Sequence, residues 1–141
     1  MPIVLATDGT LRNAAYRGYA FPFRKGLTSF PQDVVDEDLV RDSIKQIILT
    51  GVGDRVMRPT FGSDFYRFLM ENNTTLLAEL FRLEIQSSVG AFEPRVLISG
   101  IDITQNDNII DITIFYLLTL TKQPGQLSIP IANPNISQGG F

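Results

Sequence analysis

The chain has 141 residues, of which 44% are hydrophobic, and its 12 basic and 15 acidic side chains give a net charge of −3. This length and composition suit a single domain with a buried core, and the acidic balance disfavours nucleic acid as the main partner. Because the sequence contains neither Cys nor His, it excludes disulfides, Cys nucleophiles, the usual zinc sites and a Ser-His-Asp triad.

The two ends of the chain differ from its middle. Residues 1–16 lack a clear period and predict an N-terminal arm, followed by a single domain over residues 17–131 and a flexible tail over residues 132–141. The opening MPIVLAT has no basic residue and only a short apolar run, so we expect no signal peptide. No window reaches the roughly 18 apolar residues of a membrane helix, and we expect no membrane partner.

Before the first helix, the segment Gly18–Phe23 is typical of a short extended stretch. Pro22 places it at a sheet edge or strand end, because proline cannot donate a backbone hydrogen bond. Residues 26–31 are typical of a turn.

Three helices are predicted from apolar residues at helical spacing. The first covers about Asp36–Thr50, with Asp36 as its N-cap and one apolar stripe: Leu39, Val40, Ile44, Ile47 and Ile48. The second covers about Ser63–Met70, with Ser63 as its cap. The third covers about Thr75–Val89 and ends at Gly90. Its apolar side is loaded with Leu76, Leu77, Leu80, Phe81 and Leu83.

Strands follow the helices. Val96–Thr104 is apolar and β-branched, so either its first half is buried on both faces or a bulge lies at Ser99–Gly100. Ile110–Leu120 alternates strictly and should pair with it as a hairpin across the turn at 105–108. Leu127, Ile129 and Ile131 alternate in a last strand over 126–131, which Pro130 places at an edge. The expected fold is α+β, with three main helices packed on a small antiparallel sheet that has a C-terminal hairpin.

Between the first two helices runs a long irregular segment, Gly51–Leu69, that contains Arg55 and Arg58. A loop of this length in a compact domain calls for a role, such as an anion site, a catalytic site or a partner surface. It matches neither a phosphate-binding P-loop nor a dinucleotide fingerprint, and the acidic turn at 107–111 lacks EF-hand spacing. We therefore expect no cofactor and no metal.

A glycosidase would need two carboxylates about 5–10 Å apart, one of them in a less polar setting. The candidates are Glu71, Glu84 and Glu93, but no neighbouring pattern marks a cleft. In Glu93-Pro94-Arg95, the proline fixes the chain between two charged side chains, and Arg offers a planar fork of donors. This motif is either an internal salt bridge at a helix-to-strand corner or a polar contact surface for another subunit, and the sequence leaves both open.

The combination GDRVMRPTFG, an aromatic helix after it, and EPR one helix later resembles the baseplate wedge family of contractile injection tails. This family includes the small wedge protein, or sheath initiator, of T-even phage baseplates, often labelled lysozyme-like, and the corresponding type VI secretion baseplate subunit. Phe21-Pro22-Phe23 before an acidic helix start also fits, and the resemblance covers roughly residues 17–121. Asp54 stands where Glu is common in the family.

The resemblance implies a non-enzymatic structural protein of the virion tail, made in the host cytoplasm and present in sixfold copies. It implies that Glu93, Pro94 and Arg95 bind other wedge proteins, and that the loop residues Gly53, Asp54, Arg55, Arg58 and Pro59 help to build that surface. A sheath subunit is a further expected partner. We expect it at the edge of the last strand, with Leu127, Ile129 and Ile131 as contact residues, and the tail tube or hub is an additional candidate.

Two alternatives stay open from the sequence. One is a peptidoglycan hydrolase of the lysozyme-like kind, which would depend on the carboxylates named above. The other is a soluble regulatory adaptor on the same fold, since at least one bacterial stress anti-adaptor shares this architecture.

Overall fold

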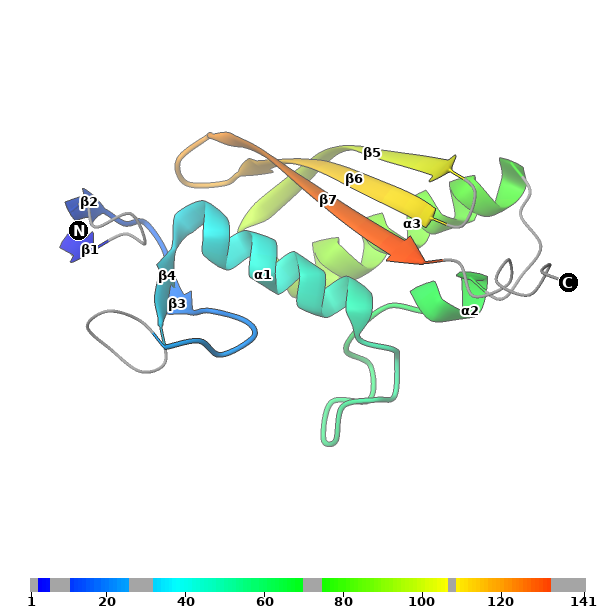
Figure 1. Ribbon diagram of the computed structural model, residues 1–141, viewed down its shortest axis with the longest axis horizontal. Coiled ribbons are helices and arrows are strands. Elements are labelled where there is room, and N and C mark those ends of the chain that lie inside the picture. The colour runs from blue at the N-terminus through cyan, green and yellow to red at the C-terminus, as the bar shows by residue number, and fades with distance from the viewer. Residues whose placement is uncertain (1–2, 6–10, 26–31, 70–74, 107–108, 133–141) are drawn as a thin grey trace, which may run out of the picture.

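A computed structural model of the chain describes residues 3–5, 11–25, 32–69, 75–106 and 109–132, and Figure 1 shows how its elements are arranged. Two short antiparallel pairs occupy the N-terminal part: β1 (Ile3–Leu5) with β2 (Leu11–Asn13), and β3 (Arg17–Tyr19) with β4 (Asp33–Val35). The expected arm therefore contains a strand pair of its own. The extended stretch expected at 18–23 leaves its ladder after Tyr19, ahead of Pro22, and the turn predicted at 26–31 lies outside the described residues.

The first helix, α1 (Asp36–Leu49), confirms most of the predicted apolar stripe: Val40, Ile44, Ile47 and Ile48 are buried, whereas Leu39 is half-buried. The prediction that Asp36 caps this helix is wrong. Val35 occupies the N-cap position without a side-chain hydrogen bond, and Asp36 is the first helical residue. Its carboxylate instead accepts hydrogen bonds from the backbone N–H groups of Ala15 and Tyr16, both at 2.8 Å. The acidic side chain thus fastens the preceding segment to the start of the helix.

The other two helices differ from their predicted lengths. The second, α2 (Phe65–Leu69), is barely more than one turn, whereas α3 (Thr75–Phe92) continues through Gly90. The helix ends because Pro94 follows and has no N–H, after Glu93 has donated its own N–H to the Val89 carbonyl at 2.8 Å. A glycine in a helix costs about 1 kcal/mol relative to alanine, which the extra turn and its packing offset.

The buried face of α3 consists of apolar residues at four-residue spacing, namely Phe81, Ile85 and Val89. Leu80 and Leu83 were expected on this face, but they are 40% and 64% exposed. Residues four apart stack along one side of a helix, and neither leucine is four residues away from a member of the buried face. Two further leucines of the predicted face have side chains outside the described residues: Leu76 and Leu77.

The main sheet has three antiparallel strands in the order β5 (Val96–Asn106), β6 (Ile109–Leu118) and β7 (Pro124–Ala132). Of the two alternatives left open for this strand, the structure has the bulge: Ile98 pairs with Tyr116 and Gly100 with Phe115, which leaves Ser99 unpaired. The predicted alternation of β6 is also confirmed, with every second residue from Ile110 to Leu118 buried. Leu120 was expected on the same face, but it lies beyond the strand and is 64% exposed.

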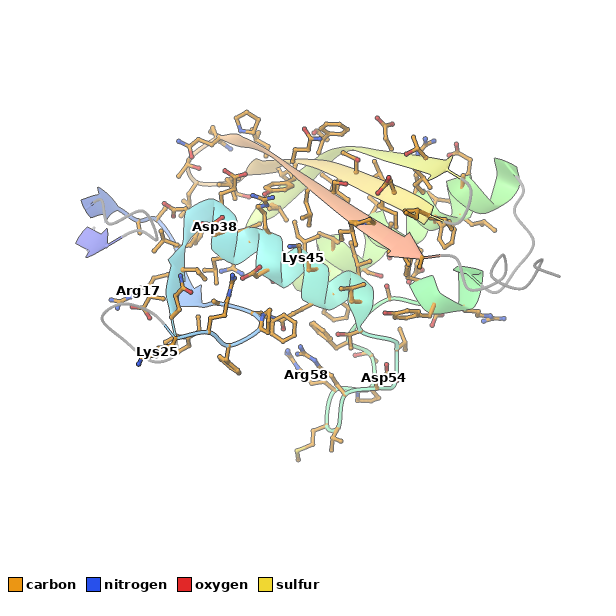
Figure 2. All side chains as sticks on the ribbon, in the orientation of Figure 1. Arg17, Lys25, Asp38, Lys45, Asp54 and Arg58 are labelled. Carbon is orange, nitrogen blue, oxygen red and sulfur yellow. The ribbon has the colours of Figure 1, made fainter. Side chains whose placement is uncertain are left out.

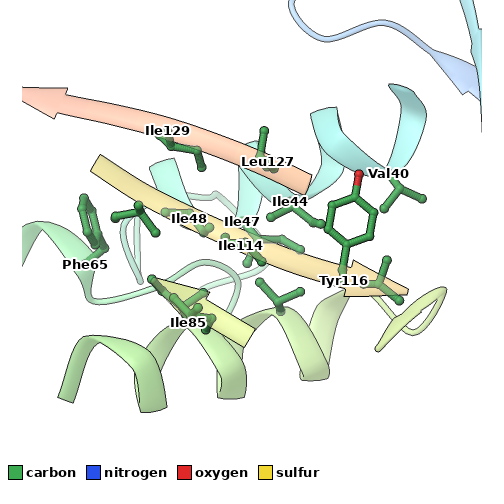
Figure 3. Packing of buried hydrophobic residues seen from close by; sticks show 14 of the residues in the cluster. Val40, Ile44, Ile47, Ile48, Phe65, Ile85, Ile114, Tyr116, Leu127 and Ile129 are labelled. Carbon is green, nitrogen blue, oxygen red and sulfur yellow. The ribbon is translucent and has the colours of Figure 1, made fainter. Parts of the chain in front are cut away.

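One hydrophobic cluster joins the helices to the inner face of the sheet (Figure 3). Its largest fully buried side chains come from every layer: Ile44 and Ile47 from α1, Phe65 from α2, Ile85 from α3, and Ile114 and Tyr116 from β6. Each such side chain contributes about 1.5–3 kcal/mol when it is fully buried. The expected mixture of helices and an antiparallel sheet is confirmed. Among the described residues, no helix is both long enough and apolar enough to span a membrane.

Candidate functional site

The loop between α1 and α2 is closed at its base by main-chain contacts. The Ser63 N–H donates to the Thr50 carbonyl at 2.9 Å, and Gly51 forms a parallel bridge with Ser63. Gly62 has φ +115°, and a Cβ there would overlap the Thr50 carbonyl oxygen, so this close approach requires glycine. Ser63 does not cap α2 as predicted. Its buried hydroxyl instead donates to the Ile48 carbonyl at 2.9 Å.

Further hydrogen bonds order the loop above its base. The Gly53 N–H donates to the Pro59 carbonyl at 2.9 Å, and the Asp54 N–H donates to the Gly51 carbonyl at 3.1 Å. The Asp54 carboxylate in turn accepts from the Gly51 N–H at 3.1 Å. These residues therefore shape the loop, and Asp54 and Arg58 can be followed in Figure 2.

Arg55 connects the loop to the body of the domain. Its guanidinium donates to Gln46 Oε1 of α1 at 3.0 Å and lies over the Phe61 ring, 3.9 Å from the ring centroid. The Phe61 ring packs in turn against Phe92 at the end of α3, with a centroid separation of 4.9 Å. Arg55 is thus turned inward as a brace.

Arg58 behaves differently from Arg55, although the sequence suggests a matched pair. It is exposed, and its side chain makes no hydrogen bond or ion pair within the part of the chain that the structure describes. Of the two arginines expected to build a partner surface, Arg58 is therefore the one whose side chain has no hydrogen bond or ion pair among the described residues.

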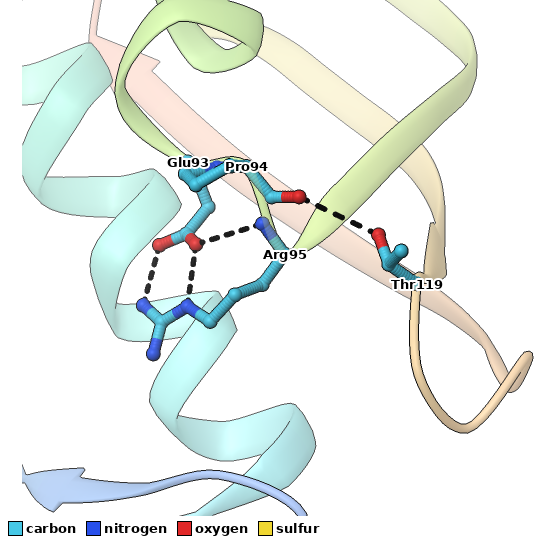
Figure 4. A network of polar contacts seen from close by, with 4 residues as sticks. All are labelled: Glu93, Pro94, Arg95 and Thr119. Atoms are coloured by element: carbon cyan, nitrogen blue, oxygen red, sulfur yellow. Dashed lines mark hydrogen bonds and ion pairs between the residues drawn. The ribbon is translucent and has the colours of Figure 1, made fainter.

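Glu93, Pro94 and Arg95 form the corner between α3 and β5 (Figure 4). The Glu93 side chain is almost fully buried, and both of its oxygens accept hydrogen bonds from Arg95, from Nε and Nη2, each at 2.6 Å. The Arg95 side chain is 31% exposed, and Pro94 is exposed. The internal salt bridge is therefore present, while Pro94 and part of the Arg95 side chain face solvent.

The charge state of this pair follows from its surroundings. Burial by itself raises the pKa of Glu93, but hydrogen bonds from Arg95 and Ser43 and the charge of Arg95 outweigh it, so the net pKa lies below its usual value. The pKa of Arg95 is raised mainly by its hydrogen bond to Glu93. Both groups are consequently charged at neutral pH, and Glu93 is unsuited to act as a general acid, a role that requires a raised pKa.

Two polar residues of α1 link the loop to this corner. Ser43 contacts the Glu93 carboxylate, and Gln46 accepts from Arg55. Because residues three apart lie on the same side of a helix, one face of α1 supports both halves of the expected surface. Sequence reasoning missed Ser43 and Gln46, since polar helix residues of this kind usually face solvent. The sign of this role in the sequence was that these two polar residues interrupt the predicted apolar stripe of the helix.

Strand β7 was expected to contact a sheath subunit through Leu127, Ile129 and Ile131. The side chains of Leu127 and Ile129 are buried in this chain's own core, and Ile131 is partly buried against it. Within the described sheet, β7 pairs with β6 on one side and has no strand on the other. A partner would therefore meet the backbone edge of β7, and these side chains would act by holding that edge in place.

Of the three carboxylates considered for hydrolysis, the two that the structure describes are each engaged in other contacts. Glu84 accepts hydrogen bonds from the Asp64 N–H and the Ser88 hydroxyl, both at 3.1 Å, and the first of these ties the residue just before α2 to α3. Glu93 is committed to Arg95. Glu71 lies outside the described residues.

Comparison with known proteins identifies relatives across most of the chain. The model of the family described as baseplate wedge protein gp25 matches residues 34–123, a span that includes α1, the loop and the Glu93-Pro94-Arg95 corner. Baseplate protein W of Escherichia phage P2 is 30% identical over 100 residues, an alignment that covers 70% of this chain and 87% of that protein.

Two solved structures share the fold. A Geobacter sulfurreducens protein described as a candidate tail lysozyme has a TM-score of 0.64 at 25% identity, covering 68% of this chain and 89% of that chain. A chain of the anti-feeding prophage baseplate, determined by cryo-EM, has a TM-score of 0.60 at 22% identity, covering 88% of this chain and 90% of that chain. At this level of identity, the second likeness shows the fold alone.

Proposed function

The chain belongs to the baseplate wedge protein gp25 family, and from this membership we propose that it is a structural component of the baseplate of a contractile tail. The family match carries the proposal, because it spans both the loop and the Glu93-Pro94-Arg95 corner. In this role the chain is made in the host cytoplasm and joins the virion tail in sixfold copies.

The corner between α3 and β5 is the proposed contact with other wedge proteins. A guanidinium has five N–H donors, and the hydrogen bonds to Glu93 engage Nε and Nη2. Nη1 makes no hydrogen bond within the described ranges, and Arg95 is partly exposed. The buried carboxylate thus fixes the orientation of a cation whose remaining donors are available to carboxylates or carbonyl groups of a neighbour.

The loop extends this proposed surface. Gly53, Asp54 and Pro59 give the loop its shape through main-chain hydrogen bonds, and Arg55 braces it against α1. Arg58 supplies an unengaged positive charge within the described residues. A rigid and partly cationic surface of this kind loses little conformational entropy when it binds.

The free edge of β7 is the proposed starting point for the sheath. An edge strand can accept an added strand from another chain, and this mode of binding is carried by backbone hydrogen bonds. Burial of Leu127 and Ile129 keeps the edge in a fixed register with β6. Pro130 removes one donor from the strand, which restricts how a partner strand can pair.

The proposed role is not enzymatic. Glycoside hydrolysis by a carboxylate pair needs one protonated and one ionised carboxylate near each other. The pKa of Glu93 is shifted downward by its contacts with Arg95 and Ser43 despite the opposing effect of burial, and Glu84 links two helices. The candidate tail lysozyme among the structural relatives makes a direct assay worthwhile, and we expect no peptidoglycan hydrolysis by the purified chain.

Assembly can be tested in the strain whose tail locus encodes this chain. Deleting the gene should abolish sheathed particles in electron micrographs, and the wild-type gene should restore them. The double variant Glu93→Gln/Arg95→Met keeps the corner neutral and similar in size, so it should fold but restore few particles. Arg82→Ala, which removes an ion-paired arginine of α3, is the matched control and should restore assembly. Normal particles in the deletion strain would refute the proposed function.

A further inference from the structure

The end of the loop between α1 and α2 carries two exposed apolar side chains. Val56 is 91% exposed and Met57 is 94% exposed, whereas the next most exposed large hydrophobic residue in the described ranges, Phe23, is 69% exposed. Figure 1 shows that this loop projects from the body of the domain. We call residues 55–58 the finger. Apolar side chains held this far from the core contribute little to folding, so their presence calls for another explanation.

The finger is held in one shape. The Arg58 N–H donates to the Arg55 carbonyl at 3.3 Å, which closes a tight turn with Val56 and Met57 at its centre. Met57 has φ +66°, a left-handed conformation that is unfavourable for a side chain of this size. Such strain persists only where surrounding contacts impose it, and it is concentrated at functional sites. Here the hydrogen bond from Arg58 to Arg55 encloses Met57 in the turn, and Arg55 is itself held by Gln46.

The charges around the finger limit what can receive it. Arg55 is turned toward Gln46 and Phe61, and the exposed Asp54 carboxylate is bonded to the Gly51 N–H, so both charges already have a partner within this chain. The unengaged charge beside the tip, within the described residues, is the cation of Arg58. The complementary surface is therefore a small apolar socket with at least one carboxylate at its rim.

We propose that Val56 and Met57 form the tip of a finger that inserts into an apolar, acid-rimmed socket on a different protein of the baseplate. This inference rests on the proposed function and specifies the chemistry of one partner site. A protein socket is favoured over a lipid surface for two reasons. Two side chains bury too little area for stable membrane attachment, and the chain as a whole carries a net charge of −3, which does not favour an anionic lipid surface.

The first test maps the neighbour of the tip. Met57 is replaced by the photo-crosslinker p-benzoylphenylalanine in the full-length chain, expressed in the particle-producing strain, and purified particles are irradiated and analysed by mass spectrometry. The expected product joins residue 57 to one site on a different protein, at apolar residues next to Asp or Glu. The matched control carries the same crosslinker at Leu83 of α3, which is 64% exposed, and should not reach that site. Incorporated chain without such a product, or a product with another copy of this chain or with lipid, overturns the inference.

The second test asks whether the contact matters. The variant Val56→Ser/Met57→Ser keeps the loop and removes its apolar tip, and it should enter particles about tenfold less than wild type, the effect of losing a central apolar anchor. Its melting temperature should be unchanged, because neither side chain is buried. Leu83→Ser is the control and should enter particles normally. Full incorporation of the tip variant overturns the inference and leaves the proposed function standing. Particles that lack the wild-type chain overturn both.

Discussion

The guanidinium carbon of Arg55 lies 3.9 Å from the centroid of the Phe61 ring, so a side chain that the sequence offers as a surface cation is used inside the loop. A cation over an aromatic face contributes about 0.5–1 kcal/mol at a partly exposed position, and the hydrogen bond to Gln46 adds to it.

Arg55→Lys should therefore loosen the loop. An ammonium group cannot stack on Phe61 and donate to Gln46 with the same planar fork. We expect a loss of about 1 kcal/mol in the free energy of unfolding and faster amide hydrogen exchange at Gly53 and nearby residues. Arg58→Lys in the same loop is the control and should leave both quantities unchanged. Equal exchange rates in the two variants would contradict the bracing role.

Removing one partner of the Glu93–Arg95 pair should cost more than removing both. Arg95→Ala leaves a buried carboxylate without its cation, and we expect about 3 kcal/mol of destabilisation in urea unfolding, near the low end for buried pairs because Arg95 is 31% exposed. Glu93→Gln/Arg95→Ala removes the buried charge and should recover part of that loss. A double variant less stable than Arg95→Ala alone would show that the carboxylate does not depend on Arg95.

The same pair predicts a sensitivity to acid. The pKa of Glu93 is lowered in the folded chain because the contacts from Arg95 and Ser43 exceed the opposing effect of burial. Its stabilising contribution is therefore present above the unfolded pKa of about 4.3, and it is lost as the pH falls toward the lower folded pKa. Glu93→Gln should flatten the fall of unfolding free energy in this acidic range. Curves of equal slope for variant and wild type would refute the prediction.

Two glycines should respond in opposite directions to alanine. At Gly90, inside α3, a Cβ meets nothing within 4 Å, so Gly90→Ala should stabilise the chain by about 0.5–1 kcal/mol. At Gly62, with φ +115°, a Cβ would overlap the Thr50 carbonyl. Gly62→Ala should destabilise by more than Gly90→Ala stabilises, and thermal unfolding of both variants measures the difference.

Tyr116 carries a buried hydroxyl that finds no hydrogen-bond partner among the described residues. Tyr116→Phe should therefore be neutral or stabilising by about 1 kcal/mol. Burial, reinforced by the charge of Glu37, raises the pKa of Tyr116 to about 12. The stability linked to this group is present below the unfolded pKa of about 10 and is lost as the pH rises toward 12. The phenylalanine variant should lose less stability than wild type over that interval.

The sheet was the most predictable part of the fold. Strict alternation from Ile110 to Leu118 fixed the inner face of β6, and Ser99-Gly100 marked the bulge in β5. These features depend on local pattern, since strand side chains alternate by geometry alone. Leu120 shows where this reasoning fails, because an apolar residue can continue the pattern after the strand has ended.

Helix ends and faces were less predictable because distant contacts decide them. Asp36 is a good capping residue by type, but its carboxylate is taken by the backbone of residues 15–16. Gly90 is a natural stop, but α3 continues because Phe92 packs against Phe61 from the loop. Leu83 has the right polarity for a core position and the wrong angular position on the helix. For the two helix ends, the deciding partner lies far away in sequence.

The candidate surface was predicted in part. The sequence identified Glu93-Pro94-Arg95 and the loop as its two components, and the internal salt bridge was one of two open readings of the first. The separation of roles between Arg55 and Arg58 could not be read from the sequence, because it depends on Gln46 approaching from α1. Contact with another wedge protein stays a prediction for both components, and contact with a sheath subunit stays a prediction for the edge of β7.

The parallel bridge between Gly51 and Ser63 joins the two ends of the loop at the body of the domain. Since the ends are already fixed, the length and sequence of the intervening segment contribute little to the entropy of folding the rest of the chain. The tip of the segment, Val56 and Met57, is therefore the part that can be exchanged while Arg55 holds the loop on the domain. Replacing these two side chains should retarget the protein to a different socket without redesign of the core.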